Sequence, residues 1–158
     1  MRSKELHKDI IMPNARRLLN KEEDRRVVEA IRQAELNTSG EIKVHIENYC
    51  RDDVEKRSLF IFDRLNMDET QQRNGVLIYL AIHNRKFAIL GDEGINKVVE
   101  EGFWNDVKDL MLSYFKEGRF ADGLEQGIQR CGEKLKTYFP LQSNKTNEIP
   151  DEISYENN

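Results

Sequence analysis

The segment from residue 73 to residue 94, RNGVLIYLAIHNRKFAILGDEG, constrains the fold most strongly. Residues 76–82 form a nearly unbroken apolar run that is short and partly β-branched or aromatic, which is typical of a strand covered on both faces. Residues 87–90 predict its antiparallel partner, with residues 83–85 as a short hairpin connection. The glycines of residues 91–94 supply the flexible backbone needed to leave the sheet. This segment therefore predicts a β-hairpin that leads into a helix.

Helices and one more strand are predicted on the two sides of this hairpin. Asn20 and Glu23 have the spacing of a capping box, and apolar residues then recur at helical spacing, which predicts a helix over about residues 21–36. Residues 41–47 alternate polar and apolar side chains and predict a strand with one face toward the core. A second helix is expected to begin at Asp53, and two apolar stripes after the hairpin predict two amphipathic helices packed on the sheet. The stripes consist of Trp104, Val107, Leu110, Met111, Tyr114 and Phe115, and of Phe120, Leu124, Ile128, Cys131, Leu135 and Phe139.

Composition narrows the class of protein. With 158 residues, 38% of them hydrophobic and 34% charged, the chain is long enough for one domain with a core of its own. A formal net charge of -4 gives no electrostatic reason to expect nucleic acid as a partner. No run approaches the ~20 apolar residues of a membrane span, and the first residues lack a signal peptide's apolar region. We therefore expect no direct membrane insertion. Cys50 and Cys131 fit no metal or redox spacing, so we expect no disulfide and a cytoplasmic location.

Three segments are expected along the chain. They are a lead segment over residues 1–20, an α/β domain over residues 21–140, and a disordered, polar and acidic tail over residues 141–158. Pro140 stops the last helix, and the tail after it is nearly free of apolar residues. A helical crossover between the first two strands, followed by the hairpin, predicts a small mixed central sheet flanked by helices.

This topology gives the sheet two distinguishable ends, and each end collects polar residues that are remote in sequence. The candidate polar site at the first end consists of Glu41, Asp68, Arg73, Asn74, Asp92 and Glu93. The opposite end collects Glu47, Asn48, Asp52 and Asp53 with the hairpin residues 83–85. The general rule for parallel α/β sheets favours the opposite end for ligands. Because a mixed sheet weakens that rule, we favour the first end, where carboxylates, backbone amides and hydroxyls converge beside flexible glycines.

Asp92 and Glu93 are the candidate metal ligands, because a hard cation such as calcium or magnesium needs oxygen ligands. The alternative is that both carboxylates solvate a turn and favour the following helix N-terminus by charge-dipole attraction. Asp68 is also consistent with a turn former or a helix cap, which is the commoner role of such residues, and Arg73 with either an anion-binding residue or an exposed charge.

Several familiar catalytic signatures are absent from the sequence. It contains no GxxxxGK[ST] phosphate loop and no GxSxG nucleophile elbow, and His7, His45 and His83 show no metal-ligand spacing. His45 falls on the polar face of the first predicted strand, so we expect a satisfied surface or interlayer histidine. The catalytic residues are therefore left unknown.

Four short stretches occur in a fixed order: TSGEIKVHIE from Thr38, RNGVLIYLA from Arg73, NRKFAILGDEGI from Asn84 and FKEGRFADGLEQGI from Phe115. In combination they resemble a TPM domain over most of residues 36–140. The resemblance implies a three-layer α/β/α sandwich, and from some family members it implies acid phosphatase activity and divalent cation binding through acidic loops near the sheet. Arg73 and Asn84 stand where many members have aspartate, and Arg73 would repel a metal held nearby.

The sequence leaves the molecular activity undetermined between competing functions. A weak metal-assisted phosphatase, a hydrolase of phosphate esters, would use Asp92 and Glu93 with either Glu41 or Asp68 to place a cation and a water molecule. A non-catalytic module would instead bind a protein or a small anion, and the replaced carboxylates and missing nucleophile favour it. A structural role within an oligomer is a third hypothesis. The expected partners are a phosphorylated substrate or a protein, and not nucleic acid.

Overall fold

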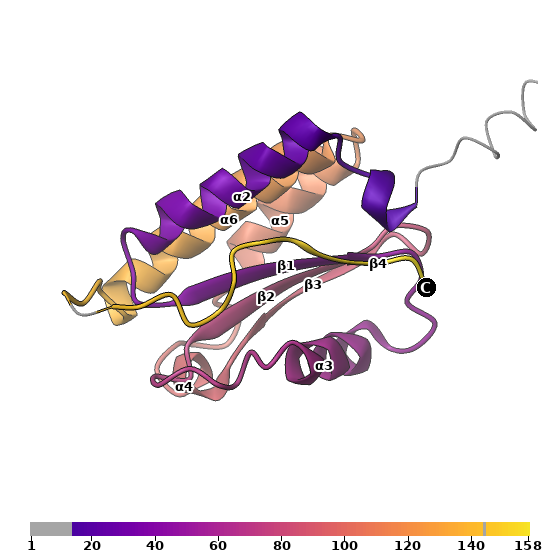
Figure 1. The fold of residues 1–158 in the computed structure, drawn as a ribbon. Helices are drawn as coiled ribbons and strands as arrows, with labels where there is room; N and C mark the ends of the chain where they lie inside the picture. Colours follow the sequence, from indigo (N-terminus) through magenta and orange to yellow (C-terminus); the bar gives the residue numbers. More distant parts are fainter. Residues whose placement is uncertain (1–13, 144) are drawn as a thin grey trace, which may run out of the picture.

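The computed structural model describes residues 14–143 and 145–158, which contain a four-stranded sheet (Figure 1). The strands, in the order β3-β2-β1-β4 across the sheet, are β3 (Lys86–Gly91), β2 (Gly75–Ala81), β1 (Glu41–Glu47) and β4 (Ser154–Glu156). β1 pairs in parallel with both β2 and β4, whereas β2 and β3 are antiparallel. The sheet is therefore mixed, as a crossover followed by a hairpin predicts.

Helices cover both faces of the sheet (Figure 1). One face is covered by α2 (Lys21–Glu35), α5 (Asn105–Phe115) and α6 (Phe120–Tyr138), and α6 packs against the other two. The remaining helices are α3 (Val54–Arg64) on the opposite face, α4 (Glu93–Asn96) after β3, and the short 3-10 helix η1 (Ala15–Arg17) before α2. This arrangement confirms the three-layer α/β/α sandwich. Within the described residues, none of the helices combines the length and the apolar character needed to cross a membrane.

The start of α2 confirms the predicted capping box. The Asn20 side chain accepts a hydrogen bond from the Glu23 N–H at 2.8 Å, and the Glu23 carboxylate accepts one from the Asn20 N–H at 2.9 Å. Two backbone donors that lack partners within the helix are thereby satisfied, which stabilises the helix start by about 1 kcal/mol.

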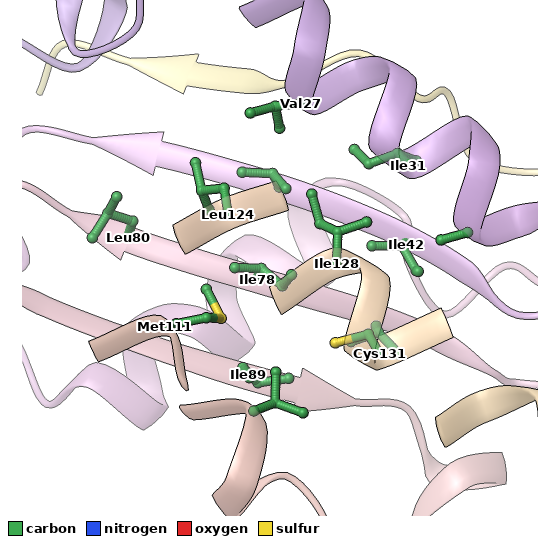
Figure 2. Close-up of a cluster of buried hydrophobic side chains, with 14 of the residues drawn as sticks. Val27, Ile31, Ile42, Ile78, Leu80, Ile89, Met111, Leu124, Ile128 and Cys131 are labelled. Atoms are coloured by element: carbon green, nitrogen blue, oxygen red, sulfur yellow. The ribbon is translucent and has the colours of Figure 1, made fainter. Parts of the chain in front are cut away.

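The larger core lies between the sheet and the helices α2, α5 and α6. Figure 2 shows apolar side chains from both layers in contact, among them Val27, Ile31, Ile42, Ile78, Leu80, Ile89, Met111, Leu124, Ile128 and Cys131. α6 approaches its neighbours closely because it carries glycine at its contact points with both of them. A Cβ at Gly132 would lie 2.9 Å from the Ala34 Cβ of α2, and one at Gly127 would lie 2.5 Å from the Met111 Sδ of α5.

The face of β1 that turns away from this core is polar and nevertheless buried. Its polar side chains, called the β1 polar row below, are Glu41, Lys43, His45 and Glu47. The C-terminal segment of the chain supplies many of their partners. The Lys43 ammonium donates to the carbonyl oxygens of Pro150 and Glu152 at 3.2 and 2.6 Å, and His45 Nδ1 lies 2.8 Å from Ser154 Oγ.

The prediction of a disordered tail over residues 141–158 is wrong for β4 and the segment before it. Figure 1 shows this segment beside β1, where β4 extends the sheet. Ile149 is 3% exposed and belongs to a smaller apolar cluster under α3, while Ile153 is 9% exposed and belongs to the larger core. These two isoleucines and the hydrogen bonds to the β1 polar row offset the entropy of ordering a segment whose average composition is polar.

The lead segment expected over residues 1–20 is only partly described. Residues 1–13, including the region examined for a signal peptide, lie outside the described residues. Ala15 is 0% exposed, and its N–H donates to the Asn48 side-chain oxygen at 2.6 Å. The described part of the lead segment therefore packs on the domain.

Candidate functional site

The polar residues predicted at the first sheet end come together in the structure. Glu41 lies opposite Gly75 in the β1–β2 register, so Asn74 directly precedes that pair. Asp92 directly follows β3, and its N–H donates to the Gly75 carbonyl oxygen at 2.9 Å. The strand ends thus place residues from three separate parts of the chain at one edge, as the topology predicts.

Arg73 holds the two candidate metal ligands. Its guanidinium forms a fork with the Asp92 carboxylate, through Nε to Oδ2 at 2.8 Å and Nη2 to Oδ1 at 3.0 Å, and its Nη1 lies 3.1 Å from Glu93 Oε1. The hydrogen bond with Asp92 is the main cause that raises the pKa of Arg73 above its usual value. Asp92 also accepts a hydrogen bond from the Glu93 N–H at 2.7 Å and caps α4, which agrees with the alternative helix-terminus role. A fixed positive charge thus occupies the position beside both carboxylates.

The loop before β2 fixes the position of Arg73. Arg73 has a φ of 50°, in the left-handed region, and its carbonyl oxygen accepts the Gly94 N–H at 2.9 Å. A Cβ at Gly94 would lie 2.2 Å from the Gln72 carbonyl oxygen, so only glycine lets α4 approach this loop. The contact between loop and helix therefore holds Arg73 next to Asp92.

Glu41 is directed toward the C-terminal segment. Its Oε1 accepts the N–H groups of Glu148 and Ile149 at 3.0 and 2.8 Å, and its Oε2 lies 3.3 Å from the Lys145 ammonium. Burial raises the pKa of Glu41 above its usual value, although the Ile149 N–H and Lys145 act in the opposite direction. Glu41 is thus committed to contacts with residues 145–149.

The last two predicted residues differ in how they are held. The buried Asn74 amide donates to Ser39 Oγ at 3.3 Å, and its Oδ1 has no hydrogen-bond partner among the described residues. Asp68 forms no hydrogen bond or ion pair with the other predicted residues in the described part of the chain, and it acts on Arg73 only through its charge. The six residues therefore share one sheet end without forming one cluster of free ligands.

A buried ionic network at the far end of β1 is the feature that sequence reasoning missed. Arg57 on α3 forks onto Glu47, with both N–O distances at 2.7 Å, and its Nη2 lies 3.3 Å from Glu156 on β4. Glu47 also accepts hydrogen bonds from the Tyr79 hydroxyl and from His45 Nε2, the latter at 3.0 Å. Burial alone would raise the pKa of Glu47, but the bonds from Arg57, His45 and Tyr79 lower it to about 2.

This network, called the Glu47 network below, contains three residues whose types and spacing resemble those of a metal site. Ligand atoms of His45, Glu47 and Glu156 lie within 4.8 Å of one another. The guanidinium groups of Arg57 and Arg64 both contact Glu156, so positive charge already balances the carboxylates. The arrangement joins β1, α3 and β4 and acts as a structural ion network. The signal for it was the run of polar residues at every second position of a strand.

The two thiols are poor candidates for a nucleophile. Cys50 and Cys131 are free and are 1% and 0% exposed. Burial raises the pKa of the Cys131 thiol to about 12, so its reactive thiolate form is disfavoured.

A mainly apolar cavity of about 450 Å³ lies at the opposite sheet end, beside the turn between β2 and β3. It is lined by Leu18, which follows η1, and by residues of the β2–β3 hairpin, of α5 and of the start of α6. The hairpin residues His83 and Arg85 are part of this lining, and both belong to the end that the rule for parallel sheets favours.

The comparison with known proteins agrees with the observed α/β/α fold. The family model described as TPM domain matches residues 14–134. The chain therefore belongs to the TPM domain family. A search of the curated proteins gives no match.

Solved structures that are similar to this chain include two that cover most of its length. The BA42 protein from the psychrophilic bacterium Bizionia argentinensis, solved by NMR, is 44% identical with a TM-score of 0.83, and the match covers 87% of this chain and 95% of that one. The N-terminal domain of a protein from P. gingivalis, also solved by NMR, is 19% identical with a TM-score of 0.62, covering 77% of this chain and 79% of that one. The second similarity concerns the fold alone.

Proposed function

We propose that this TPM domain is a non-catalytic binding module of the cytoplasm, which binds a small anion or a protein partner, and is not a metal-assisted phosphatase. The observation that carries the proposal is the fork of Arg73 on Asp92, with its further contact to Glu93. A calcium ion needs about six to eight oxygen ligands, and a magnesium ion needs a near-ideal octahedral shell. At this site the Arg73 guanidinium already forms hydrogen bonds with both Asp92 carboxylate oxygens and with one of Glu93.

The other groups that a phosphatase would need are also occupied or buried. Glu41 accepts backbone N–H groups of the C-terminal segment, and both cysteines are buried thiols. Free thiols are consistent with a reducing compartment, which supports the cytoplasmic location. Electrostatics further disfavours a cation, because Arg73 would lie beside it and repel it.

A turnover assay tests this proposal. The full chain is incubated with p-nitrophenyl phosphate and with calcium, magnesium or manganese, beside a heat-denatured control and an Asp92→Asn variant. Asparagine keeps an oxygen that caps α4 but removes the charge. We expect no turnover above the denatured control. Metal-stimulated turnover that Asp92→Asn abolishes, while the circular dichroism spectrum stays unchanged, would refute the proposal and favour the phosphatase.

A further inference from the structure

We infer that the cavity beside the β2–β3 turn, called the hairpin cavity below, binds a single-chain aliphatic anion such as a carboxylate with a hydrocarbon tail. This inference rests on the proposed function and names the class of anion that the module would bind. A volume of about 450 Å³ lies within the range of small-molecule sites. Two observations carry the inference: the apolar walls and the basic side chains among the described lining residues.

The walls of the hairpin cavity are apolar and come from separate elements. They include Leu18, Leu80, Ile82, Phe87, Phe115 and Phe120. Phe115 on α5 makes an edge contact with Phe87 of β3 at 5.2 Å between ring centroids, and it stacks on Phe120 of α6 at 5.4 Å. Because three elements hold these rings in place, the cavity is preformed and can bury a hydrocarbon chain at about 25 cal/mol per Å² of apolar surface.

Among the described residues, the charged members of the lining are basic. Arg85 and Lys116 contribute to it together with His83, and no acidic residue of the described ranges does, although the chain as a whole has a net charge of -4. No ion pair in the described portions of the chain uses Arg85 or Lys116. Glu117, the acidic neighbour of Lys116 in sequence, lies 3.4 Å from Arg119 instead. The exposed Arg85 and Lys116 can therefore meet an anionic head group.

The helix ends at the cavity do not determine the sign of the ligand charge. Lys116 is the C-cap of α5, a negative helix end, and Phe120 is the first residue of α6, a positive helix end. These two effects oppose each other, so the side chains decide. A cation would be repelled by the basic residues, and a free inorganic anion would leave the apolar walls unused. An aliphatic anion would place its hydrocarbon tail against the apolar walls and its charge beside the basic residues.

The test uses the full chain and three probes: sodium decanoate, decanol and sodium acetate. Calorimetry and amide NMR titrations should show saturable one-site binding of decanoate, with shifts at residues 82–87 and 112–120. We expect decanol to bind about tenfold more weakly because it lacks the charge, and acetate to show no saturable binding because it lacks the tail.

A charge reversal on α5 provides the matched variants. Lys116→Glu should weaken decanoate binding by roughly tenfold, since it removes an attraction and adds a repulsion. Lys108→Glu makes the same change on the same helix outside the hairpin cavity and should leave the affinity unchanged. Both positions are exposed, so neither change disturbs the core.

Four outcomes would overturn the inference. The first two are the absence of saturable decanoate binding and an equal affinity for decanol and decanoate. The third is an equal effect of Lys116→Glu and Lys108→Glu on the affinity for decanoate. The fourth is a contact of the chain's own Ile10 or Ile11 with Phe115 in nuclear Overhauser spectra of the ligand-free chain. The last would mean that the N-terminal segment fills the cavity. If decanoate does not bind and the turnover assay shows no phosphatase activity, only the assignment of the ligand is overturned. If the turnover assay shows phosphatase activity, the proposed function itself is overturned.

Discussion

Replacing Arg57 with methionine tests the energetic role of the Glu47 network. Glu47 is 0% exposed, and the Arg57 fork at 2.7 Å supplies its closest positive charge. Removal of one partner from a buried ion pair costs roughly 3–5 kcal/mol, because the other charge is left uncompensated. The Arg57 side chain is 20% exposed, so water can replace part of the interaction. We therefore expect a loss near the lower limit, about 3 kcal/mol of the free energy of unfolding.

Arg64→Met is the matched control. Arg64 lies on the same helix and also contacts Glu156, but these side chains are 43% and 28% exposed. An exposed ion pair contributes at most about 1 kcal/mol, so this variant should lose far less stability than Arg57→Met.

Urea unfolding followed by circular dichroism near neutral pH measures both losses, provided that the slope m is unchanged. A double variant, Arg57→Met with Glu47→Gln, should recover part of the loss because the uncompensated charge is gone. Equal losses for Arg57→Met and Arg64→Met would contradict this expectation, since the burial of Glu47 would then have no energetic consequence.

Three further predictions concern stability. Asn20→Ala should cost about 1 kcal/mol in urea unfolding, since it removes the capping oxygen of α2, and no loss would contradict the role of the cap. The pKa of Glu47 is lowered to about 2 from an ordinary 4.5, so its contribution to the free energy of unfolding is fully present above pH 4.5 and is lost as the pH falls toward 2. The stability of Glu47→Gln should lack this pH-dependent loss. Parallel curves of stability against pH for the variant and the parent chain would count against it. Burial raises the pKa of Glu35 to about 9, so its contribution to the free energy of unfolding is present below pH 4.5 and is lost as the pH rises toward 9. The stability of Glu35→Gln relative to the parent chain should therefore rise over that range. A difference in stability that stays constant with pH would argue against a protonated Glu35.

Local patterns were sufficient to predict the central elements of the fold. The apolar run at residues 76–82 and the turn at residues 83–85 correspond to β2 and its hairpin with β3, because strand burial and tight turns leave a signal within a few residues. The capping box at Asn20 was equally readable, since both partners lie three positions apart.

The C-terminal segment was mispredicted because its order depends on contacts remote in sequence. Lys43 meets Pro150 across 107 positions, and His45 meets Ser154 across 109. Composition alone describes residues 141–158 as polar and predicts disorder. The polar side chains of β1 were the available signal that another segment must cover this strand, since buried polar groups require partners.

The candidate site was predicted only in part for a similar reason. Topology brought Glu41, Asn74 and Asp92 to one sheet end, because strand direction alone determines which residues share an edge. The fork of Arg73 on Asp92 depends on a left-handed backbone and on the close approach of Gly94, neither of which a single sequence reveals. The hairpin cavity depends on side chains from several elements and leaves no local pattern.

Calcium titration of three chains by calorimetry and amide NMR shows whether Arg73 occupies the place of a cation. The chains are the parent, Arg73→Asp, and Arg85→Asp as a control with the same change in charge at another left-handed position, where φ is 53° compared with 50° at Arg73. We expect saturable shifts at residues 92–96 only for Arg73→Asp, because that variant replaces the guanidinium with a third carboxylate. Saturable binding at these residues in the parent chain would contradict it.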